Sequence, residues 1–141
     1  LEYKKRGQNF DYICCIYPTA VFVTGERLQL AKQMILENGA EAVLPVMRFS
    51  YPIQRALNIK DGKAFMFLPE NYNLRSQDLE LAYHDCGQFY FLETKSLLEQ
   101  KSLFPRFTIP LEVSESEAQD IVNESDWRMA EIKYKLLNKS S

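Results

Sequence analysis

Residues 11–17 of the chain read DYICCIY, and this short run constrains the fold more than any other feature. It is mostly apolar, β-branched or aromatic and stops at Pro18, a pattern that is typical of a strand covered on both faces. Such a strand needs packed elements above and below it. The residues that follow predict a helix over residues 25–38 and a second buried strand over residues 42–47.

The helix has both a start signal and a stop signal. Thr24 can cap its first turn, and Gly39 can adopt the left-handed conformation that ends it. A strand, a helix and a strand in this order favour parallel neighbours joined by a right-handed crossover. We therefore expect an α/β fold with a mixed, mainly parallel sheet, in which Pro45 marks an edge or an irregularity.

Length and composition fit a single globular domain. The chain has 141 residues, of which 46% are hydrophobic, 13% aromatic and 26% charged, so it can bury a sizeable core. A net charge of −2 predicts no broad basic face, which disfavours nucleic-acid binding. No apolar run is long enough to span a bilayer and the first residues do not read as a signal peptide, so we expect a cytoplasmic location.

The three cysteines and the single histidine do not form a metal motif. Cys14 and Cys15 are adjacent, so a strand would place their side chains on opposite faces, and neither a disulfide nor a zinc site is expected. His84 has no partner at metal-ligand spacing and no nucleophile beside it, so it is not nominated as a catalytic base. Any metal would be held by oxygen atoms.

The periodicity changes after the second strand. Residues 55–68 predict a β-hairpin around an Asp-Gly turn, and residues 69–85 are polar and irregular, which is typical of a functional loop. We expect residues of about 50–85 to form an insertion that leaves the main sheet. The remaining residues predict a strand, a helix, a strand and a final helix, at residues 88–92, 94–100, 108–113 and 123–137.

The segment Tyr17-Pro18-Thr19 is the first candidate for contact with a ligand. It follows a buried strand at its carboxyl end, where open α/β sheets place their ligands, and the Thr19 hydroxyl could meet a phosphate, a sugar or a base there. A tight turn between a strand and a helix would explain the same residues.

A second candidate lies in the expected insertion. Gln54 stands beside Arg55, and Arg75 is followed closely by Gln77. The planar guanidinium group of arginine can bind a carboxylate or a phosphate with two hydrogen bonds. Ordinary surface charge would explain any single arginine, but two such clusters in irregular segments favour an anionic ligand.

An acidic run lies between residues 115 and 126. Helix-capping patterns account for most of it, namely Glu115, Glu117, Glu124 and Asp126. Asp120 is the exception, because we expect its position between Ala118 and Ile121 to be partly buried. A carboxylate just after a strand is a natural ligand for Mg²⁺ when phosphates complete the shell.

These stretches, in this order, resemble the pseudaminic acid cytidylyltransferases, which are relatives of the acylneuraminate (sialic acid) cytidylyltransferases. The resemblance covers nearly the whole chain and rests on five motifs. They are DYICCIYPTA, RFSYPIQRAL, PENYNLRSQDLE, AYHDCGQFY and IPLEVSESEAQDI followed by SDW. It implies the C-terminal half of a Rossmann-like, three-layer nucleotidyltransferase that uses CTP and Mg²⁺ and joins CMP to a nonulosonic sugar acid with release of pyrophosphate, for surface glycans or flagellin.

The resemblance also implies roles for individual residues and a homodimer, for which the expected hairpin would serve as the dimerisation arm. Arg75 would bind the carboxylate of the sugar acid, and Asp120 would be the catalytic residue of this half, as the carboxylate that holds Mg²⁺. The other residues implied to bind substrate are Tyr17, Pro18, Thr19, Gln54, Arg55, Gln77, Gln88 and Tyr90.

Three departures from the family pattern limit this expectation. Nothing in the chain resembles the N-terminal glycine-rich phosphate loop, so we expect a fragment that begins within a domain and is inactive alone. Val21 replaces a usual proline, and Val122 replaces one of the two aspartates expected to hold Mg²⁺, which should weaken metal binding. Two alternatives stay open: a non-catalytic module that binds a sugar acid or a nucleotide, and a purely structural dimer partner.

Overall fold

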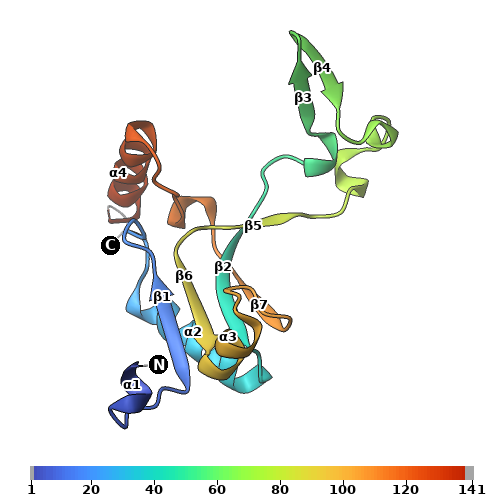
Figure 1. Cartoon of the computed structure of the whole chain (residues 1–141). Helices are drawn as coiled ribbons and strands as arrows, with labels where there is room; N and C mark the ends of the chain where they lie inside the picture. The colour runs from blue at the N-terminus through green and yellow to red at the C-terminus, as the bar shows by residue number, and fades with distance from the viewer. Residues whose placement is uncertain (1, 139–141) are drawn as a thin grey trace.

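A computed structural model describes residues 2–138 of the chain, and five of its strands form one sheet in the order β1, β6, β2, β7, with β5 also paired to β2 (Figure 1). Two further strands form a separate hairpin. The strands are β1 (Tyr12–Ile16), β2 (Ala42–Arg48), β3 (Leu57–Lys60), β4 (Lys63–Met66), β5 (Tyr83–Asp85), β6 (Phe89–Glu93) and β7 (Thr108–Glu112). The helices are α1 (Glu2–Lys5), α2 (Gly25–Asn38), α3 (Thr94–Gln100) and α4 (Glu124–Asn138), with short 3₁₀ turns η1 (Ile53–Arg55), η2 (Pro69–Asn71), η3 (Ser76–Asp78) and η4 (Glu115–Glu117).

The expectation of a mainly parallel sheet is wrong, although the α/β class holds. Within residues 2–138, only β2 and β7 pair in parallel, whereas β6 pairs antiparallel with both β1 and β2, and β5 pairs antiparallel with β2. Strands β1 and β2, which α2 connects, do run in the same direction, but β6 lies between them. A local pattern cannot reveal this, because β6 comes from much later in the chain.

The sheet has a packed cluster of side chains on each face. On one face, Ala31 and Ile35 of α2 pack with Val43 and Phe89 of the sheet. On the other face, a smaller cluster includes Leu44, Tyr90 and Leu92, with Leu97 of α3 against it. Cys14 packs against the first cluster and Cys15 against the second, which confirms that they point to opposite faces.

Helix α2 has the predicted bounds and caps. The Thr24 hydroxyl oxygen accepts a hydrogen bond from the Arg27 amide at 3.2 Å. Gly39 has a φ of 61°, and its N–H donates to the carbonyl of Ile35. The side chains Ala31 and Ile35 bury one face of the helix against the sheet, so both ends and the packed face follow from the local sequence.

Pro45 lies in the middle of β2, where the antiparallel partner strand is broken. Val43 pairs with Phe91 of β6, and Val46 pairs with Asp85 of β5. An advance of three residues along β2 therefore corresponds to six residues in the segment that contains β5 and β6. The carbonyl of Pro45 points to this side and accepts from the Cys86 amide at 3.3 Å. A proline has no N–H to donate there, so the ladder stops and residues 86–88 separate β5 from β6.

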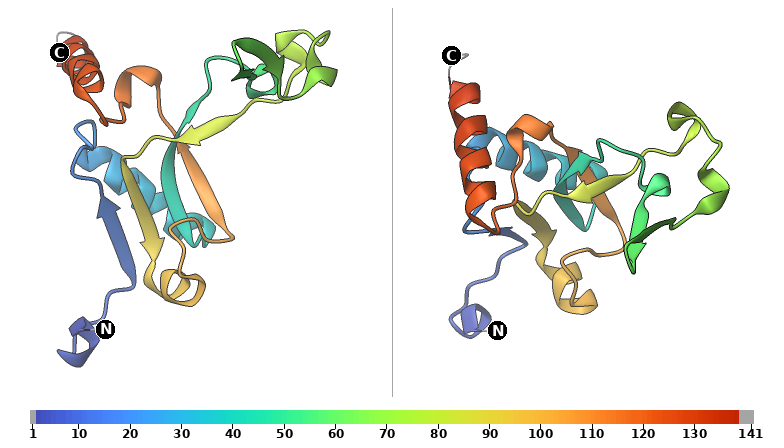
Figure 2. Two further views of the ribbon diagram at one scale, coloured as in Figure 1. Left: turned by 45° about the horizontal axis from the view of Figure 1, so that its top comes forward. Right: turned by 90° about the horizontal axis from the view of Figure 1, so that it is seen from above.

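Residues 49–82 leave the sheet between β2 and β5 and carry the hairpin of β3 and β4 away from the main body (Figure 1). Both views in Figure 2 show this arm and α4 on opposite sides of the same sheet end. In the hairpin, Leu57 pairs with Met66 and Ile59 with Ala64, so one face is apolar throughout. The predicted hairpin is therefore present, with Asp61 and Gly62 at its turn.

No helix within residues 2–138 combines the length and the apolar character that a bilayer crossing requires.

Replacing Phe89 with alanine should remove a fully buried ring from the core, because Phe89 is 0% exposed. We expect a loss of about 3–5 kcal/mol in the free energy of unfolding, measured by chemical denaturation. Phe65→Ala is the matched control, because Phe65 is 53% exposed on the hairpin, and it should cost roughly 0.5 kcal/mol or less. Equal losses for the two variants would contradict the assignment of the core to the main sheet.

Candidate functional site

Three segments meet at the carboxyl ends of β1 and β2. Gly87 lies in the break between β5 and β6 and has a φ of +62°. A Cβ added to Gly87 would lie 3.4 Å from Asp120 Oδ1 and 4.0 Å from a ring carbon of Tyr17. The absent side chain therefore leaves space between an aromatic ring and a carboxylate, and the structure brings Tyr17, Gly87 and Asp120 together.

Asp85 organises one side of this site and is a residue that sequence reasoning did not nominate. Its Oδ1 accepts from the Gly87 amide at 2.8 Å, and its Oδ2 accepts from the Tyr90 hydroxyl. The Tyr17 and Tyr90 rings pack with centroids 5.6 Å apart. An aspartate two residues before a glycine is a known turn signal, so the Asp85-Cys86-Gly87 sequence could have indicated this contact.

Burial, and then the hydrogen bond to Asp85, raise the pKa of Tyr90 far above its usual range. The Tyr90 side chain therefore stays protonated and acts as a hydrogen-bond donor rather than as a base. Burial likewise raises the pKa of the nearby Cys86 thiol to about 11, so it is not an activated nucleophile at neutral pH.

Gln88 is buried and bridges two other segments of the site. Its Nε2 donates to the carbonyl of Glu117 at 2.7 Å, and its own carbonyl accepts from the Tyr17 amide at 2.9 Å. Its Oε1 is buried and has no hydrogen-bond partner among the described residues. A buried acceptor without a donor is rare in folded proteins, and an ordered water or a bound group commonly satisfies it.

The acidic run divides as the capping patterns predict, with one correction. Glu117 forms a capping box with Ser114, and Asp126 accepts from the amides of Val122 and Asn123 at 3.0 Å each. Asp120 is exposed rather than partly buried, because it follows η4 at the rim of the site beside Gly87. No three side chains of His, Cys, Asp or Glu within residues 2–138 are grouped so that they could hold a metal.

The segment after β1 is a hydrogen-bonded turn. The carbonyl of Tyr17 accepts from the Ala20 amide at 3.0 Å, and the carbonyl of Thr19 accepts from the Val21 amide at 2.9 Å. This is the structural alternative considered for Pro18 and Thr19. Their contact with a ligand stays a prediction.

The other nominated residues lie on the arm, in a second group away from the sheet end (Figure 1). Gln54 Nε2 donates to the carbonyl of Glu80 at 2.9 Å, and Arg55 donates to the carbonyl of Leu74. Both side chains also have a buried atom, Gln54 Oε1 and Arg55 Nε, without a partner among the described residues.

Arg75 and Gln77 lie nearby on the arm but are exposed. Arg75 Nε is paired with Asp78 Oδ2 at 2.9 Å, and its side chain is 73% exposed. Gln77 lines a cavity of about 280 Å³ between the arm and the end of β2. The structure therefore splits the nominated residues into a sheet-end group and an arm group.

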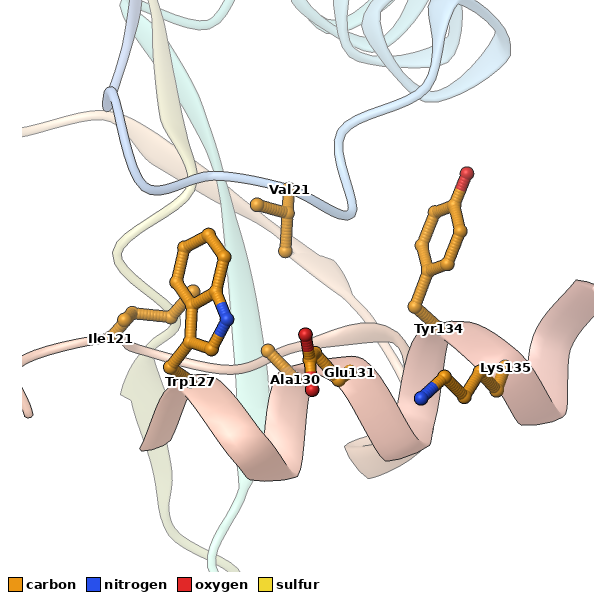
Figure 3. A pocket seen from close by; sticks show the side chains of 7 residues that line it. All are labelled: Val21, Ile121, Trp127, Ala130, Glu131, Tyr134 and Lys135. Atoms are coloured by element: carbon orange, nitrogen blue, oxygen red, sulfur yellow. The ribbon is translucent and has the colours of Figure 1, made fainter. Parts of the chain in front are cut away.

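A separate cavity of about 320 Å³ lies between α4 and the loop that contains Val21 (Figure 3). Its walls are mainly apolar, and Figure 3 shows Trp127 and Ala130 facing Val21 across it. None of the nominated residues lines it. Val21, which stands where the family usually has proline, is 43% exposed and lines this apolar cavity rather than the polar site.

The fold and the site together define an α/β protein with a polar and aromatic candidate site where β1, β2 and β7 end. No protein-family model matches the chain. The chain is, however, homologous to pseudaminic acid cytidylyltransferase: it is 32% identical over 139 residues to the enzymes of that name from two Campylobacter jejuni strains. These alignments cover 98% of the chain and 60% of each relative, so the chain spans about 60% of their length.

A more distant relative comes from Helicobacter pylori. Its name combines pseudaminic acid cytidylyltransferase with UDP-2,4-diacetamido-2,4,6-trideoxy-beta-L-altropyranose hydrolase. It is 29% identical over 122 residues, which cover 86% of the chain and 23% of that protein.

Gly87→Ala should disturb the site in a way that Gly62→Ala does not. Both glycines have a positive φ, so each alanine should cost about 1 kcal/mol of stability. Nothing lies within 4 Å of a Cβ at Gly62, whereas a methyl group at Gly87 would touch Asp120 and Tyr17. We expect NMR signals of Asp120 and Tyr17 to shift only in Gly87→Ala, and unchanged signals would show that the three residues do not meet.

Proposed function

We propose that the chain is the sugar-acid-binding part of a cytidylyltransferase that converts CTP and pseudaminic acid to the CMP-sugar and pyrophosphate. The observation that carries this proposal is the 32% identity to pseudaminic acid cytidylyltransferase over 98% of the chain. In such a reaction the anomeric hydroxyl of the sugar acid attacks the α-phosphorus of CTP, and the bond to pyrophosphate breaks. Because the chain spans about 60% of those relatives, we propose that turnover requires the remainder of such an enzyme.

The unsatisfied atoms support a ligand at the nominated residues. Four buried side-chain atoms within residues 2–138 have no hydrogen-bond partner, and three of them belong to Gln54, Arg55 and Gln88. One acceptor and the donor lie in the arm group and the other acceptor lies in the sheet-end group, so each group has an atom that a ligand or a water could satisfy. In this proposal the Tyr17 ring and Tyr90, whose hydroxyl donates to Asp85, contribute to ligand binding in the sheet-end group.

Arg75 is the proposed partner of the sugar-acid carboxylate. Its guanidinium already binds a carboxylate, that of Asp78, through Nε at 2.9 Å. The pair is exposed on the arm, so a ligand carboxylate can replace Asp78 without opening the core. Gln54 and Arg55 belong to the same arm group and would contribute to binding there.

For magnesium we propose a single protein ligand, Asp120. Asp120 is exposed beside Gly87 and fits one position of a Mg²⁺ shell, which prefers oxygen ligands. Val122 is 80% exposed and offers no side-chain oxygen, so the described residues do not complete a metal site. In a complete enzyme Mg²⁺ would neutralise phosphate charge, but no step proposed for this chain passes through the metal.

The isolated chain should bind pseudaminic acid through Arg75. We expect Arg75→Lys to weaken binding by about tenfold, measured by calorimetry or NMR titration, because lysine cannot form the two parallel hydrogen bonds of a guanidinium. Asp78→Asn should not weaken binding, since it removes the competing carboxylate. Arg128→Lys is the matched control, because Arg128 is also exposed and paired with an acid, Glu124 at 3.6 Å.

A chimeric protein would distinguish two hypotheses, that the chain is part of an enzyme and that it is a non-catalytic binding module. The chain is placed in a Campylobacter jejuni relative in place of the matching segment, and pyrophosphate release from CTP and pseudaminic acid is assayed. Turnover by the chimera, with none from the chain alone, is the expected result. Tight binding without turnover by the chimera would favour the non-catalytic module instead.

We further propose that the apolar face of the hairpin pairs with a second copy of the chain. A two-stranded hairpin is at best marginally stable alone, and here Leu57 and Ile59 are 58% and 75% exposed. Ile59→Asp should shift the chain toward monomer in analytical ultracentrifugation, because it places a charge in the proposed contact. Asn58→Asp on the opposite face is the control, and an identical response of both variants would argue against this contact.

A further inference from the structure

An ion pair joins helix α2 to the turn η4 beside the candidate site. Arg27 Nη2 lies 2.7 Å from Glu117 Oε1, although the two residues are 90 positions apart in the chain. The Arg27 side chain is 13% exposed, so this contact is mostly screened from water. The second terminal nitrogen of the guanidinium, Nη1, donates to the carbonyl of Phe22 at 3.1 Å. Arg27 thus ties the loop after β1 to η4.

Glu117 is held from its other side as well. The Ser114 hydroxyl donates to Glu117 Oε2 at 2.7 Å, which leaves Oε1 for Arg27. The Ser114 hydrogen bond, and then the charge of Arg27, lower the pKa of Glu117, so its carboxylate stays ionised at neutral pH. Ser114 alone would satisfy the cap of η4, so the contact with Arg27 is not needed to form that turn.

The backbone of Glu117 passes this restraint to the site. Its carbonyl accepts from Gln88 Nε2 at 2.7 Å, and the carbonyl of Gln88 accepts from the Tyr17 amide at 2.9 Å. Asp120 follows Glu117 by three residues and reaches the space above Gly87. One continuous series of contacts therefore runs from Arg27 to the three segments that form the sheet-end group.

We propose that Arg27 is a positioning residue: through Glu117 it holds Gln88 and Asp120 in place for the ligand. The guanidinium is suited to this role because it forms two hydrogen bonds at once, one to η4 and one to the loop that follows Tyr17. This inference rests on the proposed function only in the identity of the ligand, which is the sugar acid. The placement of Gln88 can be tested without any ligand.

The test uses the isotope-labelled chain and follows the side-chain amide signal of Gln88 by NMR. Arg27→Met removes the charge at similar length, and Arg27→Lys keeps the charge but loses the second hydrogen bond. We expect the Gln88 signal to shift and its hydrogen exchange to accelerate about tenfold in Arg27→Met, with a smaller effect in Arg27→Lys. Arg128→Met, which removes an exposed pair on α4, is the control and should leave Gln88 unchanged.

Exchanging the two charges of the ion pair then shows whether a change at Gln88 comes from lost positioning or from a general loss of stability. Arg27→Glu combined with Glu117→Arg restores an ion pair in the reverse direction, and it should recover much of the Gln88 signal that either single variant loses. Thermal unfolding of each variant is measured in parallel. A Gln88 signal that stays unchanged in Arg27→Met, or that changes only in proportion to overall stability, would overturn the proposal.

Affinity for pseudaminic acid supplies the second measurement. Arg27→Met should weaken binding by about tenfold, and the charge exchange should recover part of that loss. If the unaltered chain does not bind the sugar acid, the proposed function fails, yet the Gln88 measurements still decide whether Arg27 positions the site. If the unaltered chain binds and Arg27→Met binds equally well, the positioning role fails while the proposed function stands.

Discussion

The missing N–H of Pro45 is the constraint on which the candidate site depends. Residues 41, 43 and 45 of the β2 segment face the antiparallel partner, and the ladder ends where the third of them has no hydrogen to donate. The regular ladder with β2 is therefore interrupted at residues 86–88, where the Cys86 amide bonds the Pro45 carbonyl and the Gln88 carbonyl accepts from Tyr17, and Gly87 lies beside Asp120. A regular ladder would have kept Gly87 in the sheet, away from the acidic segment after β7.

Much of the local structure could be predicted because its causes are local. Thr24 and Gly39 fix the ends of α2 through contacts within four residues, and the alternation of Cys14 and Cys15 follows from strand geometry. The direction of strand pairing could not be predicted from the same signals. It depends on β6 entering between β1 and β2, and the sequence of β6 would suit a parallel or an antiparallel position equally well.

The candidate site was predictable in its residue types but not in its arrangement. Recognisable motifs pointed to Tyr17, Gln88 and Asp120, and the structure gathers them at one sheet end. The exposure of Asp120 was misjudged because its apolar neighbours indicated burial, whereas its position at a rim depends on tertiary contacts. The ion pair of Arg27 with Glu117 spans 90 positions, a separation at which sequence patterns carry no information about pairing.

Strand β1 has consequences for how the chain behaves in a test tube. It pairs with β6 along one edge, and no strand within residues 2–138 pairs with its other edge. That edge belongs to a run of Tyr, Ile and Cys side chains without the lysine, proline or bulge by which proteins commonly protect such edges. Purified alone, the chain therefore presents a ready template for intermolecular sheet growth, and concentration, storage temperature and thiol reduction will govern how long it remains dispersed.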